Sequence, residues 1–269
     1  MDITRRGFIG AMGATGAAMG LRPVMARTVN MPAKPALPDL FAPRSVVLFQ
    51  GDSITHGGRG GDLNHYLGHG WQAVVAHRYL GYQPEKEILF ANRAVSGDTT
   101  EKMLKRWKTE GLSIDLKERG FLGAFKMNTT MLKPDVLSIL VGVNDFGSSV
   151  KVPLESFRSN YTNLIEQSLA ANPKLKIILC QPFRLSLPSG PVKAAEFRTY
   201  QDCVAELSVK YHTPFVRFQN LFDSLLAENP NPKYWSWDSV HPTYAAHIRM
   251  ADFWIASVAD FYGKSTPAR

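Results

Sequence analysis

The stretch VVLFQGDSITHGG, residues 46–58, places a serine where an apolar segment ends. Residues 46–50 are apolar or neutral, as in a buried strand, and a glycine-rich segment follows Gly51, Asp52 and Ser53. A plain turn would use these residue types, because glycine and aspartate are common in turns. A nucleophile at the end of a strand would use them too. The rest of the chain must distinguish the two interpretations, since a nucleophilic serine needs a base and an orienting acid.

Apolar runs alternate with helical patterns along the rest of the chain. This alternation predicts an α/β fold, in which helices cover both faces of a five-stranded parallel sheet. No internal repeat and no linker to a second domain is evident, so one doubly wound domain is expected. Strands are predicted at residues 45–50, 87–91, 135–141, 176–181 and 214–218, and helices at about 70–80, 98–110, 153–170, 191–211 and 242–261.

Two helix boundaries carry specific signals. Asp98, Thr99 and Thr100 precede Glu101, which predicts an N-cap followed by an acidic first turn. Pro242 suits the first turn of the last helix and would place His241 at the start of that helix. The core-facing side of this helix is expected at Ala245, Ile248, Ile255 and Val258.

The first 26 residues have the pattern of an export signal. Arg5 and Arg6 precede a weakly apolar Gly/Ala-rich segment, and residues 24–26 (VMA) form a small-residue cleavage site. Paired arginines in this position are typical of twin-arginine export, which predicts a bacterial periplasmic or secreted protein. The predicted division is a signal peptide at 1–26, a Pro-rich lead-in at 27–43, one folded domain at 44–262 and a short tail at 263–269.

Charge and composition exclude several other classes of protein. The formal net charge of the chain is +8, and removal of residues 1–26, which carry three arginines and one aspartate, would leave +6. The basic residues are dispersed and no nucleic-acid motif accompanies them, so no nucleic-acid partner is expected. No apolar run is long enough for stable membrane insertion after signal removal. Cys180 and Cys203 are interpreted as buried free thiols, although an exported protein could pair them.

Polar residues follow three predicted strands and precede the last predicted helix. In an open parallel sheet, ligands bind outside the carboxyl ends of the strands, so these residues should share one edge. Each segment alone is common in turns and caps, and their combination is what points to chemistry. The segments are Gly51-Asp52-Ser53, residues 92–98 (NRAVSGD), residues 142–145 (GVND) and residues 237–242 (WDSVHP).

Together these segments contain the groups that acyl transfer requires. Asp238 and His241 are three residues apart, so one short loop could present an imidazole to Ser53 and orient it with a carboxylate. A tetrahedral oxyanion needs fixed hydrogen-bond donors. The candidates are the backbone N–H groups of Ser53 and Gly97 and the side-chain amide of Asn144.

The four segments resemble those of the SGNH (GDSL-type) hydrolase family, and the resemblance spans residues 44–262. It implies a flavodoxin-like three-layer α/β/α sandwich and a serine ester hydrolase that needs no metal or other cofactor. Its serine, glycine, asparagine and histidine would be Ser53, Gly97, Asn144 and His241, with Asp238 beside the histidine. The G-x-S-x-G motif of the α/β-hydrolases is absent around Ser53.

Other polar residues receive weaker assignments. Asp52 is interpreted as a turn and cap residue, and Asp145 as a stabiliser of the Asn144 loop through backbone hydrogen bonds. Asp62, His65 and His69 could form a metal site, but their spacing is generic, and a role in lining the substrate cleft is favoured for that loop. Trp235 and Trp237 could pack or stack on a sugar. The candidate substrate-binding residues are Arg59, His65, His69, Phe183, Arg184 and Trp237.

The nature of the ester is predicted from context. The export signal, the lack of an amphipathic lid, and the resemblance of YWSWDSVHPTYAAH (residues 234–247) to enzymes of polysaccharide breakdown favour removal of O-acetyl groups from carbohydrate. The partner would be a small-molecule or polysaccharide ester. A lysophospholipase or general short-chain carboxylesterase is the alternative. A non-catalytic carbohydrate-binding protein on the same fold is the alternative of another class.

Overall fold

The five predicted strands form one parallel sheet in the computed structural model, which describes residues 33–59, 67–107, 114–115, 131–147, 151–185 and 191–265. Their order is β2-β1-β5-β6-β7, and every pairing in the sheet is parallel. This is the flavodoxin-like order, so the predicted fold class is confirmed. The strands are β1 (Val46–Gly51), β2 (Leu89–Asn92), β5 (Val136–Leu140), β6 (Lys176–Cys180) and β7 (Phe215–Val216), and a separate antiparallel pair joins β3 (Ile114–Asp115) to β4 (Met131–Leu132).

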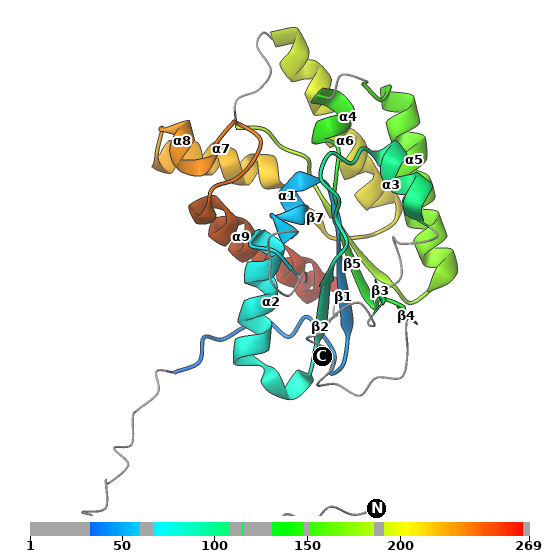
Figure 1. The fold of residues 1–269 in the computed structure, drawn as a ribbon, viewed down its shortest axis with the longest axis vertical. Coiled ribbons are helices and arrows are strands. Elements are labelled where there is room, and N and C mark those ends of the chain that lie inside the picture. The colour runs from blue at the N-terminus through cyan, green and yellow to red at the C-terminus, as the bar shows by residue number, and fades with distance from the viewer. Residues whose placement is uncertain are drawn as a thin grey trace, which may run out of the picture. The chain divides into compact units, whose positions relative to one another are not determined.

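Helices connect the strands and cover the sheet on both faces (Figure 1). The described helices are α1 (Ser53–His56), α2 (Trp71–Tyr82), α3 (Thr100–Arg106), α4 (Val143–Gly147), α5 (Leu154–Ala171), α6 (Pro191–Lys210), α7 (Phe218–Glu228), α8 (Pro232–Trp235) and α9 (Tyr244–Ser265), with a 3-10 turn at Pro84–Lys86. None of the helices in these ranges is long and apolar enough to cross a membrane.

The central strand β1 shows why two helical layers are needed. Successive side chains of a strand point to opposite faces, and all six residues of β1 are buried. Val47 and Phe49 belong to the core shared with α2, α7 and α9, whereas Val46 and Leu48 belong to the core shared with α3, α5 and α6. Figure 1 shows these two groups of helices on opposite sides of the sheet. The predicted three layers are therefore present.

The described part of the Pro-rich lead-in, from residue 33, contains no helix, as predicted. It nevertheless contributes to the core, because Phe41 is buried and its ring centroid lies 4.7 Å from that of Tyr79 and 5.5 Å from that of Phe90. Residues Pro35–Arg269 form one compact unit. The segment 1–26, where the export signal is predicted, lies outside the described residues.

One predicted helix start is confirmed and the other is wrong. The Thr99 hydroxyl accepts a hydrogen bond from the backbone N–H of Lys102 at 3.3 Å and so caps α3. The last helix begins at Tyr244 rather than at Pro242, because Pro242 forms an isolated β-bridge with Ser236. His241 therefore lies in a loop that precedes α9.

The predicted core face of α9 is partly wrong as well. Ile255 and Val258 are buried as expected, but Ile248 is 47% exposed. The largest buried side chains of this helix are instead Met250 and Trp254. The shift follows from the path of the helix across the sheet, which a periodic pattern alone does not give.

The two cysteines are free and buried, as predicted. Cys180 belongs to the core on the α9 side of the sheet and Cys203 to the core on the α6 side. The sheet lies between these two cores, so the two thiols do not approach each other. Burial raises the pKa of both thiols, to about 12 for Cys180 and to about 11 for Cys203.

Candidate active site

Ser53 lies at the carboxyl edge of the sheet, where β1 passes directly into α1. A Cβ atom on Gly51 would lie 2.3 Å from the carbonyl oxygen of Leu140 on β5, so the close strand approach requires glycine at this position. The buried Asp52 is the N-cap of α1, and its carboxylate accepts a hydrogen bond from Ile54 N–H at 3.0 Å. This local geometry presents Ser53 as the first residue of a helix.

The structure brings Ser53, His241 and Asp238 together across 188 residues of chain. His241 Nε2 lies 2.8 Å from Ser53 Oγ, and His241 Nδ1 lies 2.6 Å from Asp238 Oδ2. The carboxylate accepts from Nδ1–H, which leaves the lone pair of Nε2 facing the serine hydroxyl. A neutral imidazole in this tautomer can accept the proton of Ser53.

Asp238 is held by the loop that it belongs to. Its Oδ1 accepts hydrogen bonds from the backbone N–H of Val240 at 3.0 Å and of His241 at 2.7 Å. Burial alone would raise the pKa of Asp238, but the hydrogen bonds from His241 and Val240 outweigh burial and lower that pKa. These hydrogen bonds therefore favour the carboxylate form of Asp238.

Further hydrogen bonds close the loop around these two residues. The hydroxyl of Ser236 and the backbone N–H of Trp237 both donate to the carbonyl oxygen of His241, at 2.8 and 3.1 Å. Ser239 has a φ of +73°, a left-handed conformation that is uncommon for residues other than glycine. Its carbonyl accepts from Leu185 N–H at 3.0 Å, which ties the strained turn to the segment after β6.

Gly97 and Asn144 follow the two strands that flank β1, so they approach Ser53 from neighbouring positions in the sheet. Gly97 has a φ of +78°, and a Cβ atom there would meet no heavy atom within 4 Å. The Asn144 amide donates one hydrogen bond to the carbonyl of Asp98 at 2.9 Å. An amide carries two N–H donors, and the second has no partner among the residues that the structure describes.

Two buried carboxylates connect these loops. Asp145 accepts from the backbone N–H and the hydroxyl of Thr100, at 2.9 and 2.6 Å. It therefore joins α4 to the start of α3, whereas the sequence predicted that it would stabilise its own loop. Asp98 forms an ion pair with Arg106, whose guanidinium also donates to Gln50 on β1 at 3.2 Å. The two bonding patterns hold the segments after β2 and β5 together and tie them to β1.

Asp52 is a cap residue, as predicted, but it is also an unusual carboxyl group. Burial raises its pKa from 3.8 to about 7, the Ile54 N–H opposes this shift, and the carboxylates of Asp145 and Asp98 add to it. The folded state therefore binds a proton at Asp52 more tightly than the unfolded state does. The contribution to stability is full below pH 4 and falls as the pH rises to about 7.

Replacement of Asp52 by asparagine should remove this pH dependence. Asparagine keeps the oxygen that caps Ile54 N–H and carries no charge, so the variant should gain in Tm relative to wild type as the pH rises from 4 to 7. We expect a gain of roughly 3 °C or more at pH 8 compared with pH 4, measured by thermal unfolding. Asp52→Ala is the control, because it loses the cap and should be destabilised at every pH. A difference between Asp52→Asn and wild type that is constant with pH would contradict the assignment.

A cavity of about 250 Å³ opens beside Ser53 and His241. Of the candidate substrate-binding residues, His69 and Trp237 line it, and Trp237 is 61% exposed. Two residues that the sequence analysis did not single out, Tyr244 and His247, also line it. The sequence could have indicated both residues, because they lie three and six positions after His241, at the start of the helix that follows the catalytic loop.

The other described candidate residues do not line this cavity. The prediction that Phe183 contacts substrate is wrong, because Phe183 is fully buried and stacks on Phe222 with ring centroids 4.2 Å apart. Arg59 donates to the carbonyl of Ala94 at 3.3 Å and does not line the cavity. Neither does Arg184, whose backbone N–H donates to Gln219. His65 and Asp62, two of the three residues of the possible metal site, lie outside the described residues. Within the described ranges, no group of three or more metal-binding side chains occurs.

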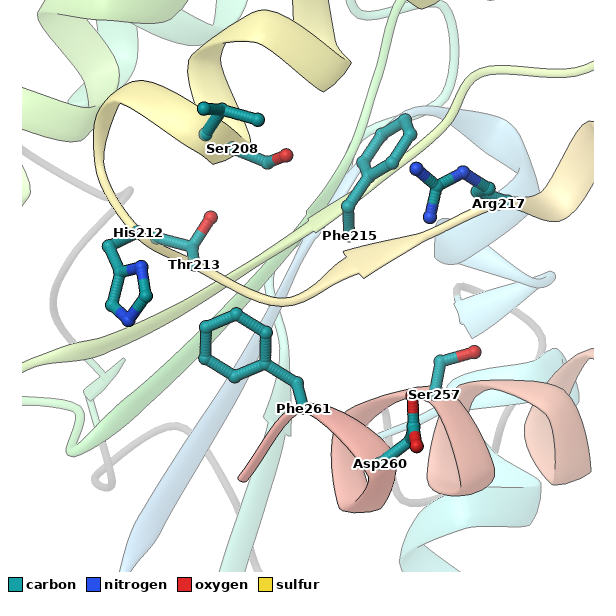
Figure 2. Close-up of a pocket in the computed structure, with 9 residues that line it drawn as sticks. Ser208, His212, Thr213, Phe215, Arg217, Ser257, Asp260 and Phe261 are labelled. Atoms are coloured by element: carbon teal, nitrogen blue, oxygen red, sulfur yellow. The ribbon is translucent and has the colours of Figure 1, made fainter. Parts of the chain in front are cut away.

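A larger cavity of about 610 Å³ lies away from this site, at the edge strand β7. Figure 2 shows Phe215 of β7, Arg217 just after that strand, and Asp260 and Phe261 of α9 among the residues that line it. The cavity holds the serines Ser208 and Ser257, but the hydrogen-bonded serine and histidine line the smaller cavity. The smaller cavity is therefore the candidate active site.

Comparisons with known proteins agree with this geometry. Residues 49–249 match the model of the GDSL-like lipase/acylhydrolase family. An acetylxylan esterase from Geobacillus stearothermophilus is 27% identical over 215 residues, which are 76% of this chain and 90% of the esterase. A crystal structure of a Parabacteroides merdae protein, assigned as a GDSL-like lipase, is 29% identical, with a TM-score of 0.69 over 82% of this chain and 99% of that one. The structure of the Geobacillus acetylxylan esterase Axe2 has a TM-score of 0.66 at 24% identity, over 81% of this chain and 96% of that one. With the serine, histidine and aspartate hydrogen-bonded in sequence at the carboxyl edge of the sheet, this chain belongs to the GDSL-like lipase/acylhydrolase family.

Proposed function

We propose that the protein is a serine ester hydrolase that removes O-acetyl groups from carbohydrate by forming an acyl-enzyme on Ser53. The observation that carries the proposal is the continuous hydrogen bonding from Ser53 through His241 to Asp238. The similarity to an acetylxylan esterase supports the choice of substrate. We also propose that residues 1–26 direct export through the twin-arginine route, which would bring the enzyme to extracellular polysaccharide.

In the proposed reaction, His241 Nε2 takes the proton of Ser53 while Ser53 Oγ attacks the acetyl carbonyl carbon. The negative charge on the carbonyl oxygen would be stabilised by the N–H groups of Ser53 and Gly97 and by the amide of Asn144. His241 then protonates the sugar oxygen, and the carbon–oxygen bond to the sugar breaks. Water, activated by His241, attacks the acetyl-serine and releases acetate. Asp238 orients the imidazole and stabilises its cationic form in both halves of the reaction.

The size of the cavity favours a short acyl group. A volume of about 250 Å³ is below the usual range for pockets that enclose drug-sized ligands. Its lining includes three histidines and Asp238, whereas a long acyl chain would need an extended apolar surface. This observation places acetyl esters ahead of the lysophospholipase alternative.

A series of nitrophenyl esters from acetate to long chains tests the proposal, followed by acetate release from acetylated xylo-oligosaccharides. We expect kcat/KM to fall by roughly tenfold or more between the acetate and the octanoate ester, because the added methylenes lack space. A preference for long chains would favour the lysophospholipase alternative. No hydrolysis of any ester would favour the non-catalytic carbohydrate-binding alternative.

A further inference from the structure

His247 lies in the second turn of α9 and is only 6% exposed, yet it lines the cavity beside Ser53 and His241. Its Nδ1 lies 3.1 Å from the backbone nitrogen of Trp71, the first residue of α2. A backbone N–H can only donate, so Nδ1 of His247 must present a lone pair to Trp71. The proton of the neutral imidazole is therefore on Nε2.

The surroundings of His247 keep the ring neutral. Burial lowers its pKa to about 4, and the neighbouring histidines His69 and His241 act in the same direction. At neutral pH, His247 is thus a fixed donor with a single N–H, held in orientation by the start of α2.

The Nε2–H of His247 has no acceptor in the part of the chain that the structure describes, where the only hydrogen bond of this side chain is the one to Trp71. Among the described residues, the Nε2 atom of His247 is not one of the solvent-inaccessible polar atoms without a partner. The atom is therefore open to solvent, and it faces the cavity that His247 lines. A ligand that displaces water from a donor at a cavity wall must supply an oxygen in its place, or the donor is left unpaired.

The chemistry of the proposed substrate indicates which oxygen it is. The acetyl methyl group cannot accept a hydrogen bond, the carbonyl oxygen is directed to the proposed donors Gly97 and Asn144, and the ester oxygen receives its proton from His241. Neither Gly97 nor Asn144 is among the described residues that line this cavity. The acceptors that remain belong to the alcohol part of the ester.

We infer that His247 binds the alcohol part of the substrate by donating Nε2–H to a hydroxyl or ring oxygen of the acetylated sugar. The inference rests on the proposed function and adds a residue that selects esters of polyols. An ester whose alcohol lacks neighbouring oxygens, such as nitrophenyl acetate, gains nothing from this donor. Selection by a buried donor is effective because a ligand without the acceptor leaves that donor unpaired.

Two substitutions separate the binding role of His247 from its structural role. In His247→Asn, the amide oxygen lies near the position of Nδ1 and can still accept from Trp71 N–H, while the Nε2–H is lost. In His247→Gln, the longer amide can place an N–H near the position of Nε2, while the bond to Trp71 is weakened. Kinetics on acetylated xylo-oligosaccharides and on nitrophenyl acetate, together with Tm, should be measured for both variants.

For His247→Asn we expect kcat/KM on the acetylated sugar to fall about tenfold or more, mainly through KM, with less than about a twofold change on nitrophenyl acetate. For His247→Gln we expect a lower Tm with most of the activity on the sugar retained. Equal losses of His247→Asn on both substrates, or no loss on the sugar, would overturn the inference.

Wild-type kinetics distinguish failure of the proposed function from failure of this inference. If the wild type cleaves nitrophenyl acetate but not acetylated sugars, the proposed substrate is wrong. Long-range ¹H–¹⁵N spectra then decide the role of His247 without turnover. We expect the Nε2–H tautomer in the free enzyme and a shift of that resonance on addition of unacetylated xylo-oligosaccharide. An Nδ1–H tautomer, or no shift at saturating sugar, would refute the binding role.

Discussion

Replacement of Ser53 by alanine is expected to lower kcat for nitrophenyl acetate by roughly 10⁴-fold or more. The reason is that Ser53 Oγ is the atom 2.8 Å from the base His241, and alanine offers nothing that could carry an acyl group. The protein should fold as before, because Ser53 is the first residue of α1 and the cap of that helix comes from Asp52. Steady-state kinetics and the mass of the protein trapped during turnover provide the measurement, and the acetylated form should be lost in the variant.

Ser208→Ala is the matched control for Ser53→Ala. Ser208 is a buried serine of the larger cavity, and its hydroxyl donates to the carbonyl of Ala205 at 2.7 Å. Its loss should leave turnover within about twofold of wild type. Retention of more than about one per cent of activity in Ser53→Ala would remove Ser53 from the role of nucleophile.

Replacement of Asp238 by asparagine is expected to lower kcat by about 10³- to 10⁴-fold, by analogy with the aspartate of serine-protease triads. Asparagine can still accept from the backbone N–H groups of Val240 and His241, so the turn should persist. The amide N–H₂ would then face Nδ1 of His241 and favour the tautomer with its proton on Nε2. That tautomer cannot accept the proton of Ser53.

Thermal unfolding should show a Tm for Asp238→Asn close to that of wild type, which would separate orientation of His241 from folding. Asp223→Asn provides the matched control, because Asp223 is an exposed carboxylate on α7 that accepts only from Gln219 in the described structure. It should retain wild-type activity. If Asp238→Asn lost less than about tenfold in kcat, Asp238 would not be the group that orients His241.

The sheet was predictable because its strands are buried on both faces. In β1, β5 and β6 nearly every side chain is covered, and the resulting apolar runs stand out against the polar connections. The helix α7 was missed, although Leu221, Phe222 and Leu225 have a helical spacing. Its first residue, Phe218, had been assigned to the preceding strand.

The site was predictable only as far as its residue types and its position on the sheet edge. Ser53, Gly97 and Asn144 follow adjacent strands, so their proximity came from topology. Phe183 shows the limit of this reasoning. It also follows a strand, but its side chain points into the core, and the direction of a side chain after a strand depends on the path of the loop.

The sequence by itself determined the fold class and the serine, histidine and aspartate that chemistry requires, because those depend on local apolar patterns and on residue type. Only the tertiary structure decided the tautomers of the histidines, the pKa of Asp52 and the presence of His247 in the cavity. These properties depend on contacts between residues that are far apart in the chain, such as His247 with Trp71 and Asp145 with Thr100. Burial and hydrogen bonding in three dimensions set the charge and the direction of each group, and no pattern along the chain carries that information.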